Sequence, residues 1–282
     1  MNCSTYLTLI IIIKQFNFGL NMFSLTNIFT QDGSRIKPKR KPVSRNFRIP
    51  LIGEKAPSFT TETTAGTINF PFDFGTSWKI ILSHPMDFTP VCSTELIELA
   101  NLQDEFENLG VRIITVSTDP LETHKQWKKT LEQIEYKEYP RQKINFPIAD
   151  DSNLVIAKLY GMIHLESDSN RDVRGVFIID HDNKIRAEFF YPLEVGRNMN
   201  ELLRTVIALQ TTDRNNVMTP ANWNIGNDVL IPFPLKADMS AMNKKSGEYY
   251  QFSWFLIFKK GPEEVKAHKP DVLTISGRSD ST

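Results

Sequence analysis

The chain has 282 residues, with 33 basic and 33 acidic side chains and a formal net charge of +0. Because 40% of its residues are hydrophobic, it can bury a core, which excludes a wholly disordered protein. The length fits one large or two modest domains. The two cysteines, Cys3 and Cys92, are too few for a disulfide-stapled secreted scaffold or a cysteine-based zinc cluster. This cysteine usage favours a reducing compartment, and we expect a cytoplasmic protein.

The zero net charge hides a strong segregation of charge along the chain. Residues 1–50 hold eight basic residues and one acidic residue, a net charge of +7, whereas residues 51–282 carry a net charge of −7. An acidic globule repels the phosphate backbone, so we expect no nucleic-acid binding by the folded body. The basic stretch at residues 35–48 is interpreted as a solvated arm interrupted by prolines, with a localisation or nucleic-acid patch as the alternative.

We expect residues 1–48 to form a disordered leader. The apolar run at residues 6–13 is much shorter than the ~20 residues that a membrane-spanning helix needs. A signal peptide has its positive charge before the apolar run, but here Lys14 follows it. The run therefore predicts no membrane association. Translation that starts at Met22 would remove both the run and Cys3, and a targeting role for this segment remains the other reading.

From about residue 50 onward, strand-like and helix-like patterns of apolar residues alternate. In chain order the expected elements are a strand at 78–83, a helix from Pro90 to Leu109 ended by Gly110, a strand at 111–117, a helix that begins at Asp119-Pro120 and carries Trp127, a strand at 146–149, a helix at 154–160, a hairpin of residues 173–180 and 185–191, and a helix at 199–210. This order predicts an α/β fold with a central mixed sheet flanked by helices.

The segment SHPMDFTPVCSTE joins the first of these strands to a helix and places one cysteine at the helix start. Thr89 suits the N-cap and Pro90 the first helical position, so Cys92 falls in the first turn, where the helix dipole favours a thiolate. Lowering a free thiol from a pKa of about 8.5 to about 6 takes roughly 3.4 kcal/mol, and a helix end supplies about 2 kcal/mol at best. A reactive Cys92 therefore needs a nearby cation such as an arginine. The alternative is an inert, buried cysteine.

The loop PMDFTPVC at residues 85–92 resembles the P-x-x-x-T-x-x-C active-site loop of peroxiredoxins, and its wider context at residues 83–96 is similar to the 1-Cys branch. Further similar segments are NFPIADD (145–151), VRGVFIID (173–180), YPLEVGRNMNELLR (191–204) and TPANW (219–223). The resemblance runs from about residue 49 to about residue 262. It implies a thioredoxin-like fold, with a peroxidase domain at residues 49–212 and a smaller C-terminal oligomerisation domain at residues 213–282.

The resemblance also implies roles for individual residues. Cys92 would be the peroxidatic cysteine, which attacks the O–O bond of hydrogen peroxide or an organic hydroperoxide and becomes a sulfenic acid. Thr89 would hydrogen-bond the thiolate and the incoming peroxide, and Pro85 would shield the sulfur. Arg174 matches the family arginine that stabilises the thiolate and the transition state. Arg197 matches a second family arginine near the site.

The remaining chemistry-bearing residues give weaker signals. His84 is a candidate contact to the substrate or the reductant, although a histidine before proline is more often simply packed. The five histidines show no metal-ligand spacing and no cofactor-binding motif is present, so we expect neither a metal nor a cofactor. The segment GTSWK at residues 75–79 ends in Lys79, which departs from the G-x-S-x-G lipase motif of mammalian 1-Cys relatives, and no lipase activity is expected.

The sequence contains no resolving cysteine after Cys92. The tail at residues 246–258 resembles the C-terminal arm of archaeal and bacterial relatives, some of which carry cysteines there, but Gln251 and Ile257 stand in those places. Because a sulfenic acid is resolved by another thiol, this departure predicts a 1-Cys cycle with an external reductant such as glutathione or a thioredoxin-type protein. The aromatic residues of the tail suggest burial against a second protomer, so we expect a homodimer or a larger ring.

Two other functions remain open from the sequence. Oxidation of Cys92 in a redox sensor or an oligomeric chaperone would signal rather than detoxify. A thioredoxin-like binding module without catalysis is the third reading, which the complete active-site loop disfavours.

Overall fold

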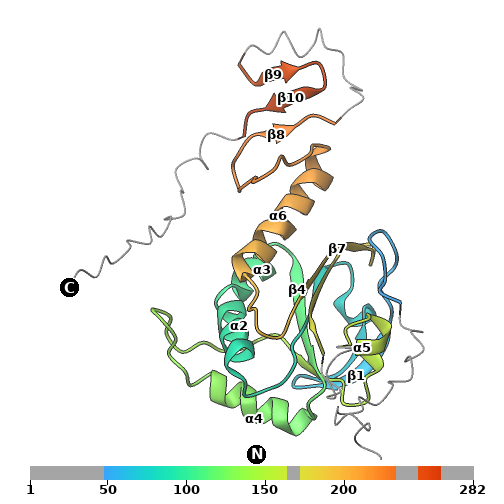
Figure 1. The fold of residues 1–282 in the computed structure, drawn as a ribbon, viewed down its shortest axis with the longest axis vertical. Coiled ribbons are helices and arrows are strands. Elements are labelled where there is room, and N and C mark those ends of the chain that lie inside the picture. The colour runs from blue at the N-terminus through green and yellow to red at the C-terminus, as the bar shows by residue number, and fades with distance from the viewer. Residues whose placement is uncertain (1–47, 164–171, 233–246, 262–282) are drawn as a thin grey trace, which may run out of the picture. The chain divides into compact units, whose positions relative to one another are not determined.

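The computed structural model describes residues 48–163, 172–232 and 247–261, so the predicted leader lies outside the described residues apart from Arg48. A seven-stranded mixed sheet forms the centre, with the strand order β2-β1-β5-β4-β3-β6-β7 (Figure 1). The strands are β1 (Phe59–Thr63), β2 (Gly66–Phe70), β3 (Trp78–Ser83), β4 (Val111–Ser117), β5 (Ile148–Asp150), β6 (Arg174–Ile179) and β7 (Ile185–Tyr191). β3 pairs parallel with β4 and antiparallel with β6, which confirms the predicted mixed sheet.

The helices cover both faces of this sheet. They are α2 (Pro90–Asn101), α3 (Gln103–Asn108), α4 (Leu121–Leu131), α5 (Val155–Leu159) and α6 (Met199–Asn215), with a short 3-10 turn η2 at Phe72–Phe74. Alternate residues of β3 point to opposite faces: Ile80 and Leu82 pack with α2, α3, α4 and α6, whereas Ile81 packs with α5 and the β1–β2 hairpin. The first of these two cores is the one that contains Cys92.

The structure differs from the sequence prediction in several elements. The helix expected from Pro90 to Leu109 is broken at Leu102, where the backbone N–H bonds to the carbonyl of Leu99, three residues back, and α2 ends. The apolar stripe still holds, because Leu99 and Phe106 on the two pieces enter the same core. The helix after Asp119 begins one residue later than predicted, with Pro120 as its N-cap.

A second, three-stranded sheet follows α6. It contains β8 (Val229–Leu230), β9 (Tyr249–Ser253) and β10 (Leu256–Lys259), in the order β8-β10-β9. A bridge between Met218 and Leu230 ties the segment after α6 to this sheet. The predicted boundary between the two domains, after residue 212, falls inside α6 and stays a prediction. Among the described residues, no helix is long and apolar enough to cross a membrane.

One buried acid just before β6 makes the stability of the fold depend on pH. Asp172 is fully buried, and neither of its carboxyl oxygens has a hydrogen-bond partner among the described residues. Burial, together with the negative charges of Asp151 and Asp119, raises the pKa of Asp172 well above its ordinary value. The folded protein therefore keeps this carboxyl protonated at a pH where the unfolded chain has lost the proton.

Replacement of Asp172 by Asn should remove this pH dependence. The stability that depends on the protonated carboxyl is present below the unfolded pKa of about 4 and is lost as the pH rises through the raised folded pKa. In urea unfolding at pH 8, Asp172→Asn should be more stable than the parent, with a difference that shrinks toward pH 4. Glu107→Gln, on the exposed face of α3, is the control. The same pH dependence in Asp172→Asn and the parent would contradict this account.

Candidate active site

The strand-to-helix junction places Cys92 as the sequence predicts. β3 ends at Ser83, a short loop follows, and Thr89 is the N-cap of α2 with Pro90 as its first residue. Cys92 is therefore the third helical residue, where the backbone N–H groups of the first turn present the positive end of the helix dipole. Its side chain is fully buried in the core beneath α2. The helix end thus supplies part of the field that a thiolate needs.

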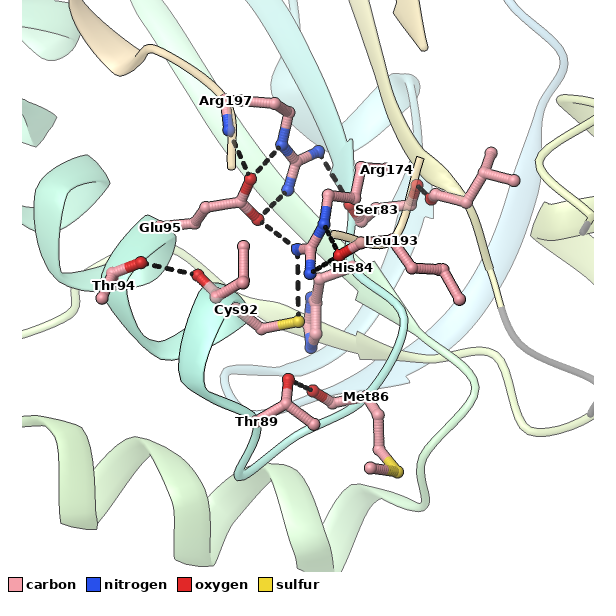
Figure 2. A network of polar contacts seen from close by, with 12 residues as sticks. Ser83, His84, Met86, Thr89, Cys92, Thr94, Glu95, Arg174, Leu193 and Arg197 are labelled. Atoms are coloured by element: carbon pink, nitrogen blue, oxygen red, sulfur yellow. Dashed lines mark hydrogen bonds and ion pairs between the residues drawn. The ribbon is translucent and has the colours of Figure 1, made fainter. Parts of the chain in front are cut away.

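The cation that a reactive Cys92 requires is Arg174. Its Nη1 donates to Sγ of Cys92 at 3.3 Å (Figure 2). The guanidinium is held in place because its Nε and Nη2 both donate to the carbonyl of Leu193, at 3.0 and 2.7 Å. Two unit charges at this separation interact by on the order of 5 kcal/mol at an effective dielectric constant of about 20. This gross attraction exceeds the shortfall of about 1.4 kcal/mol that the helix dipole leaves.

Glu95 organises the positive charge around the thiol. It lies three residues after Cys92 on α2, is only 2% exposed, and accepts a hydrogen bond from Nη1 of Arg174 at 2.7 Å. It also accepts from Nε, Nη2 and the backbone N–H of Arg197, at 2.9, 2.6 and 2.8 Å. Burial by itself raises the pKa of Glu95, but the charge and hydrogen bonds of Arg197, with the charge of Arg174, hold it below the ordinary value. Two guanidinium groups and one carboxylate leave a net charge of +1 beside Cys92.

Arg197 supports this cluster from the side away from the sulfur. Its Nη1 donates to the backbone carbonyls of Ser83, at the end of β3, and Gly175, on β6, at 2.7 and 3.0 Å. It therefore joins two neighbouring strands to α2 through Glu95. A cavity of about 340 Å³ lies beside these two side chains, on the outer flank of α2. Among the hydrogen bonds of the described residues, none joins Arg197 to Cys92.

Glu95 is a site residue that was not predicted from the sequence. A usable signal was present, because a glutamate three residues after the cysteine on one helix lies on the same helix face. A carboxylate on the buried side of a helix needs a cationic partner. The pattern alone does not show which cation that is, because the two arginines lie far along the chain.

The predicted loop residues Thr89 and Pro85 lie next to the thiol in sequence and differ in their contacts. The hydroxyl of Thr89 donates to the carbonyl of Met86 at 2.8 Å, and no hydrogen bond among the described residues joins it to Cys92 (Figure 2). Pro85 is buried between the end of β3 and the turn that precedes α2. Thr89 therefore serves as the N-cap by position, while its side chain holds the loop together.

His84 belongs to a buried cluster that its sequence neighbours did not reveal. Its Nε2 lies 2.8 Å from Oδ1 of Asp87, and Nδ1 of His124, on α4, lies 2.6 Å from Oδ2 of the same carboxylate. Burial is the main cause that lowers the pKa of His84, so its ring is neutral at pH 7. The ring also lies against Trp127, with 5.0 Å between centroids. His84 is thus packed and hydrogen-bonded at the start of the active-site loop.

Two histidines and a carboxylate can in principle hold a metal ion, and the sequence spacing gave no sign of this group. The N···O distances are those of ordinary hydrogen bonds, which a metal would have to displace. A histidine that binds a metal usually donates its outer N–H to a partner. Here the outer nitrogens, Nδ1 of His84 and Nε2 of His124, have no partner among the described residues. The arrangement fits a hydrogen-bonded cluster better than a metal centre.

The Glu95 network predicts a large and pH-dependent loss of stability in Glu95→Gln. Removing the shared carboxylate leaves two buried guanidinium groups without a counter-charge, so urea unfolding at pH 7 should show a loss of about 3–5 kcal/mol. Because the pKa of Glu95 is depressed in the folded state, its contribution is present above the unfolded pKa of about 4.3 and is lost as the pH falls through the folded value. The difference from the parent should therefore shrink in acid.

Glu98→Gln is the matched control, because Glu98 lies three residues after Glu95, in the next turn of α2. Glu98 pairs with Lys137 at the surface, and a pair of that kind contributes at most about 1 kcal/mol. If the two variants lost similar free energies of unfolding, the ion pairs of Glu95 would contribute no more than an exposed surface pair.

Known proteins resemble this chain over most of its length. A peroxiredoxin of Methanosarcina mazei is 42% identical over 221 residues, which cover 77% of this chain and 100% of the relative. A 1-Cys peroxiredoxin of Dictyostelium discoideum is 40% identical over 199 residues, 71% of this chain and 79% of the relative. Among solved structures, yeast mitochondrial 1-Cys peroxiredoxin is similar with a TM-score of 0.67 and 37% identity, over 76% of this chain and 100% of that chain.

Family models match the two parts of the chain separately. Residues 52–188 match the AhpC/TSA family, and residues 208–243 match the C-terminal domain of 1-Cys peroxiredoxin. The first match contains the junction with Cys92, and the second begins within α6. The thioredoxin-like fold with its small C-terminal extension agrees with these matches, as does the resemblance of the active-site loop. The chain therefore belongs to the peroxiredoxin family, in its 1-Cys branch, and is a thiol-dependent peroxidase.

Proposed function

We propose that Cys92 is the thiolate that performs the peroxidase reaction on hydrogen peroxide and organic hydroperoxides. The sulfur attacks one peroxide oxygen, the S–O bond forms as the O–O bond breaks, and hydroxide or alkoxide leaves and takes a proton from water. The sulfur is oxidised to a sulfenic acid and the peroxide is reduced. The observation that carries this assignment is the 3.3 Å contact from Arg174 to Sγ within a buried cluster of net charge +1.

The surrounding residues receive distinct roles in this proposal. Arg174 stabilises the thiolate and the negative charge that develops on the departing oxygen. Arg197 contributes to substrate binding indirectly, because it holds Glu95 and the strand ends in place. Thr89 turns its hydroxyl from Met86 to the incoming peroxide, and Pro85 keeps water away from the sulfur.

An external thiol resolves the sulfenic acid. Cys92 is the single cysteine among the described residues, and Ile257, one of the two positions where some relatives carry cysteines, is buried on β10. The solved yeast 1-Cys peroxiredoxin has its thiol resolved through glutathione and thioredoxin systems. We extend that chemistry to this chain as glutathione or a thioredoxin-type donor, in the cytoplasm. Since the matched proteins are peroxiredoxins, this turnover enzyme is favoured over a redox sensor or an oligomeric chaperone.

The C-terminal sheet supports assembly into a homodimer or a larger ring. Phe252 and Phe255, at the β9–β10 hairpin, are 74% and 56% exposed. Large aromatic side chains that gather on one exposed hairpin favour burial against another protein surface. We propose that the surface is a second protomer, which is testable by sedimentation of the full chain.

Replacement of Cys92 by Ser should abolish peroxide consumption. Stoichiometric hydrogen peroxide should add the mass of one oxygen atom to Cys92 in the parent, and mass spectrometry of the native protein reads this directly. Cys3→Ser is the control, because Cys92 should be oxidised in that variant at the rate of the parent. Peroxidase turnover that survives in Cys92→Ser would refute the assignment.

Replacement of Arg174 by Gln should lower the thiolate population of Cys92. Loss of the cation removes at least the ~1.4 kcal/mol that the helix end cannot supply, which corresponds to about a tenfold lower ratio of thiolate to thiol and hence to a lower thiolate fraction at pH 7. The rate of alkylation by iodoacetamide at pH 7 measures that fraction. Arg204→Gln, which removes a partly exposed arginine paired with Glu201 on α6, is the control and should leave the rate unchanged. An unchanged rate in Arg174→Gln would exclude the cation as the source of reactivity.

A further inference from the structure

Asp87 is the point at which the active-site loop is attached to the rest of the molecule. Its two carboxylate oxygens accept hydrogen bonds from His84, at the end of β3, and from His124, on α4. Its backbone N–H donates to Oδ2 of Asp119, in the segment between β4 and α4, at 2.6 Å. Asp87 and the two histidines are at most 3% exposed. Three hydrogen bonds from three parts of the chain therefore meet at one loop residue.

The residue that follows Asp87 is held in an unfavourable conformation. Phe88 has a φ of 54°, in the left-handed region that is uncommon for a residue with a bulky side chain. Phe88 is 53% exposed, so little burial offsets the cost. Such a conformation persists when the surrounding structure over-determines it. The chain is fixed on both sides of Phe88, by the bonds of Asp87 directly before it and by the bond from Thr89, directly after it, to Met86.

The thiol geometry lies immediately beyond this turn. Thr89 is the N-cap and Cys92 the third residue of α2, so the direction of the first turn of α2 depends on how the chain leaves Phe88. The contact from Arg174 to Sγ at 3.3 Å requires that direction. A displacement near 1 Å at a reacting centre costs on the order of a hundredfold in rate.

His124 is hydrogen-bonded to the active-site loop through Asp87. Burial by itself raises the pKa of Asp87, but the hydrogen bonds from His124 and His84 hold it below the ordinary value, so the carboxylate is ionised and both oxygens accept. Nδ1 of His124 must then carry the proton that it donates, and Nε2 has no partner among the described residues. No hydrogen bond among the described residues joins His124 to Cys92.

We propose that Asp87 and His124 are positioning residues for the peroxidatic thiol: the charged hydrogen bond between them fixes the left-handed turn at Phe88 and thereby places Sγ against Arg174. The inference rests on the function proposed for Cys92. It adds His124 on α4, which acts without contacting the sulfur or the peroxide. It assigns to Nδ1 of His124 a proton and a hydrogen bond to Asp87.

Two substitutions of His124 separate the bond from the packing of the ring. The amide nitrogen of Asn can take the place of Nδ1, which makes the bond to Asp87, whereas that of Gln reaches the place of Nε2, which makes none. In His124→Gln the second-order rate constant for oxidation by hydrogen peroxide should fall about tenfold or more, while His124→Asn should stay within about threefold of the parent. Alkylation of Cys92 by iodoacetamide should follow the same order, and urea unfolding of each variant records any change in stability.

Several results would overturn the proposal. Oxidation of His124→Gln at the parent's rate would do so, and so would an equal loss in the two variants, because then the ring and not the bond would matter. If neither variant folds, long-range ¹⁵N NMR of the imidazoles in the unchanged protein decides, because a proton on Nε2 of His124 instead of Nδ1 excludes the proposed bond. If Cys92 of the parent does not react with peroxide, the proposed function is refuted instead. The alkylation rates of the His124 variants and the position of the proton on His124 would still test this inference.

Discussion

The carboxylate of Glu95 is the interaction on which the site depends. Two guanidinium groups lie in the core beneath α2, and each buried ion without a partner costs several kcal/mol. One carboxylate that bonds both of them removes most of that cost but cancels only one of the two charges. The remaining positive charge faces Cys92, and the thiolate that we propose there balances it. The stability of this core and the proposed reactivity of Cys92 therefore depend on the same cluster.

The mixed sheet brings this cluster together. Because β6 runs antiparallel to β3, its first residue, Arg174, lies beside the end of β3, where the active-site loop begins. α2 starts directly after that loop, so Cys92 and Glu95 face the same strand end. The segment between β7 and α6 then brings Arg197 back across the ends of both strands. If β6 ran parallel to β3, its first residue, Arg174, would lie at the other end of the strands, away from the active-site loop.

Local signals in the sequence were sufficient for some of these features and insufficient for others. The place of Cys92 follows from Thr89 and Pro90, because helix starts are encoded within a few residues. A reactive thiol at a helix start needs a cation as well as the helix dipole, and the family resemblance pointed to Arg174. Glu95 escaped because its partners lie 79 and 102 residues away. The β1–β2 hairpin escaped because its strands are polar and largely exposed, with few of the apolar residues that periodicity detects.

The burial of Cys92 sets two opposite demands on the loop before α2. A peroxide is small and reacts in a site whose charges are already arranged, which favours a rigid loop. A reducing thiol belongs to a larger molecule, and it must reach a sulfur that is fully buried in the reduced state. The loop must therefore hold Sγ firmly before oxidation and release it afterwards. Oxidation helps the release, because a neutral sulfenic acid no longer balances the positive charge that Glu95 leaves uncancelled. The bonds of Asp87, which we propose as the anchor of this loop, oppose that opening.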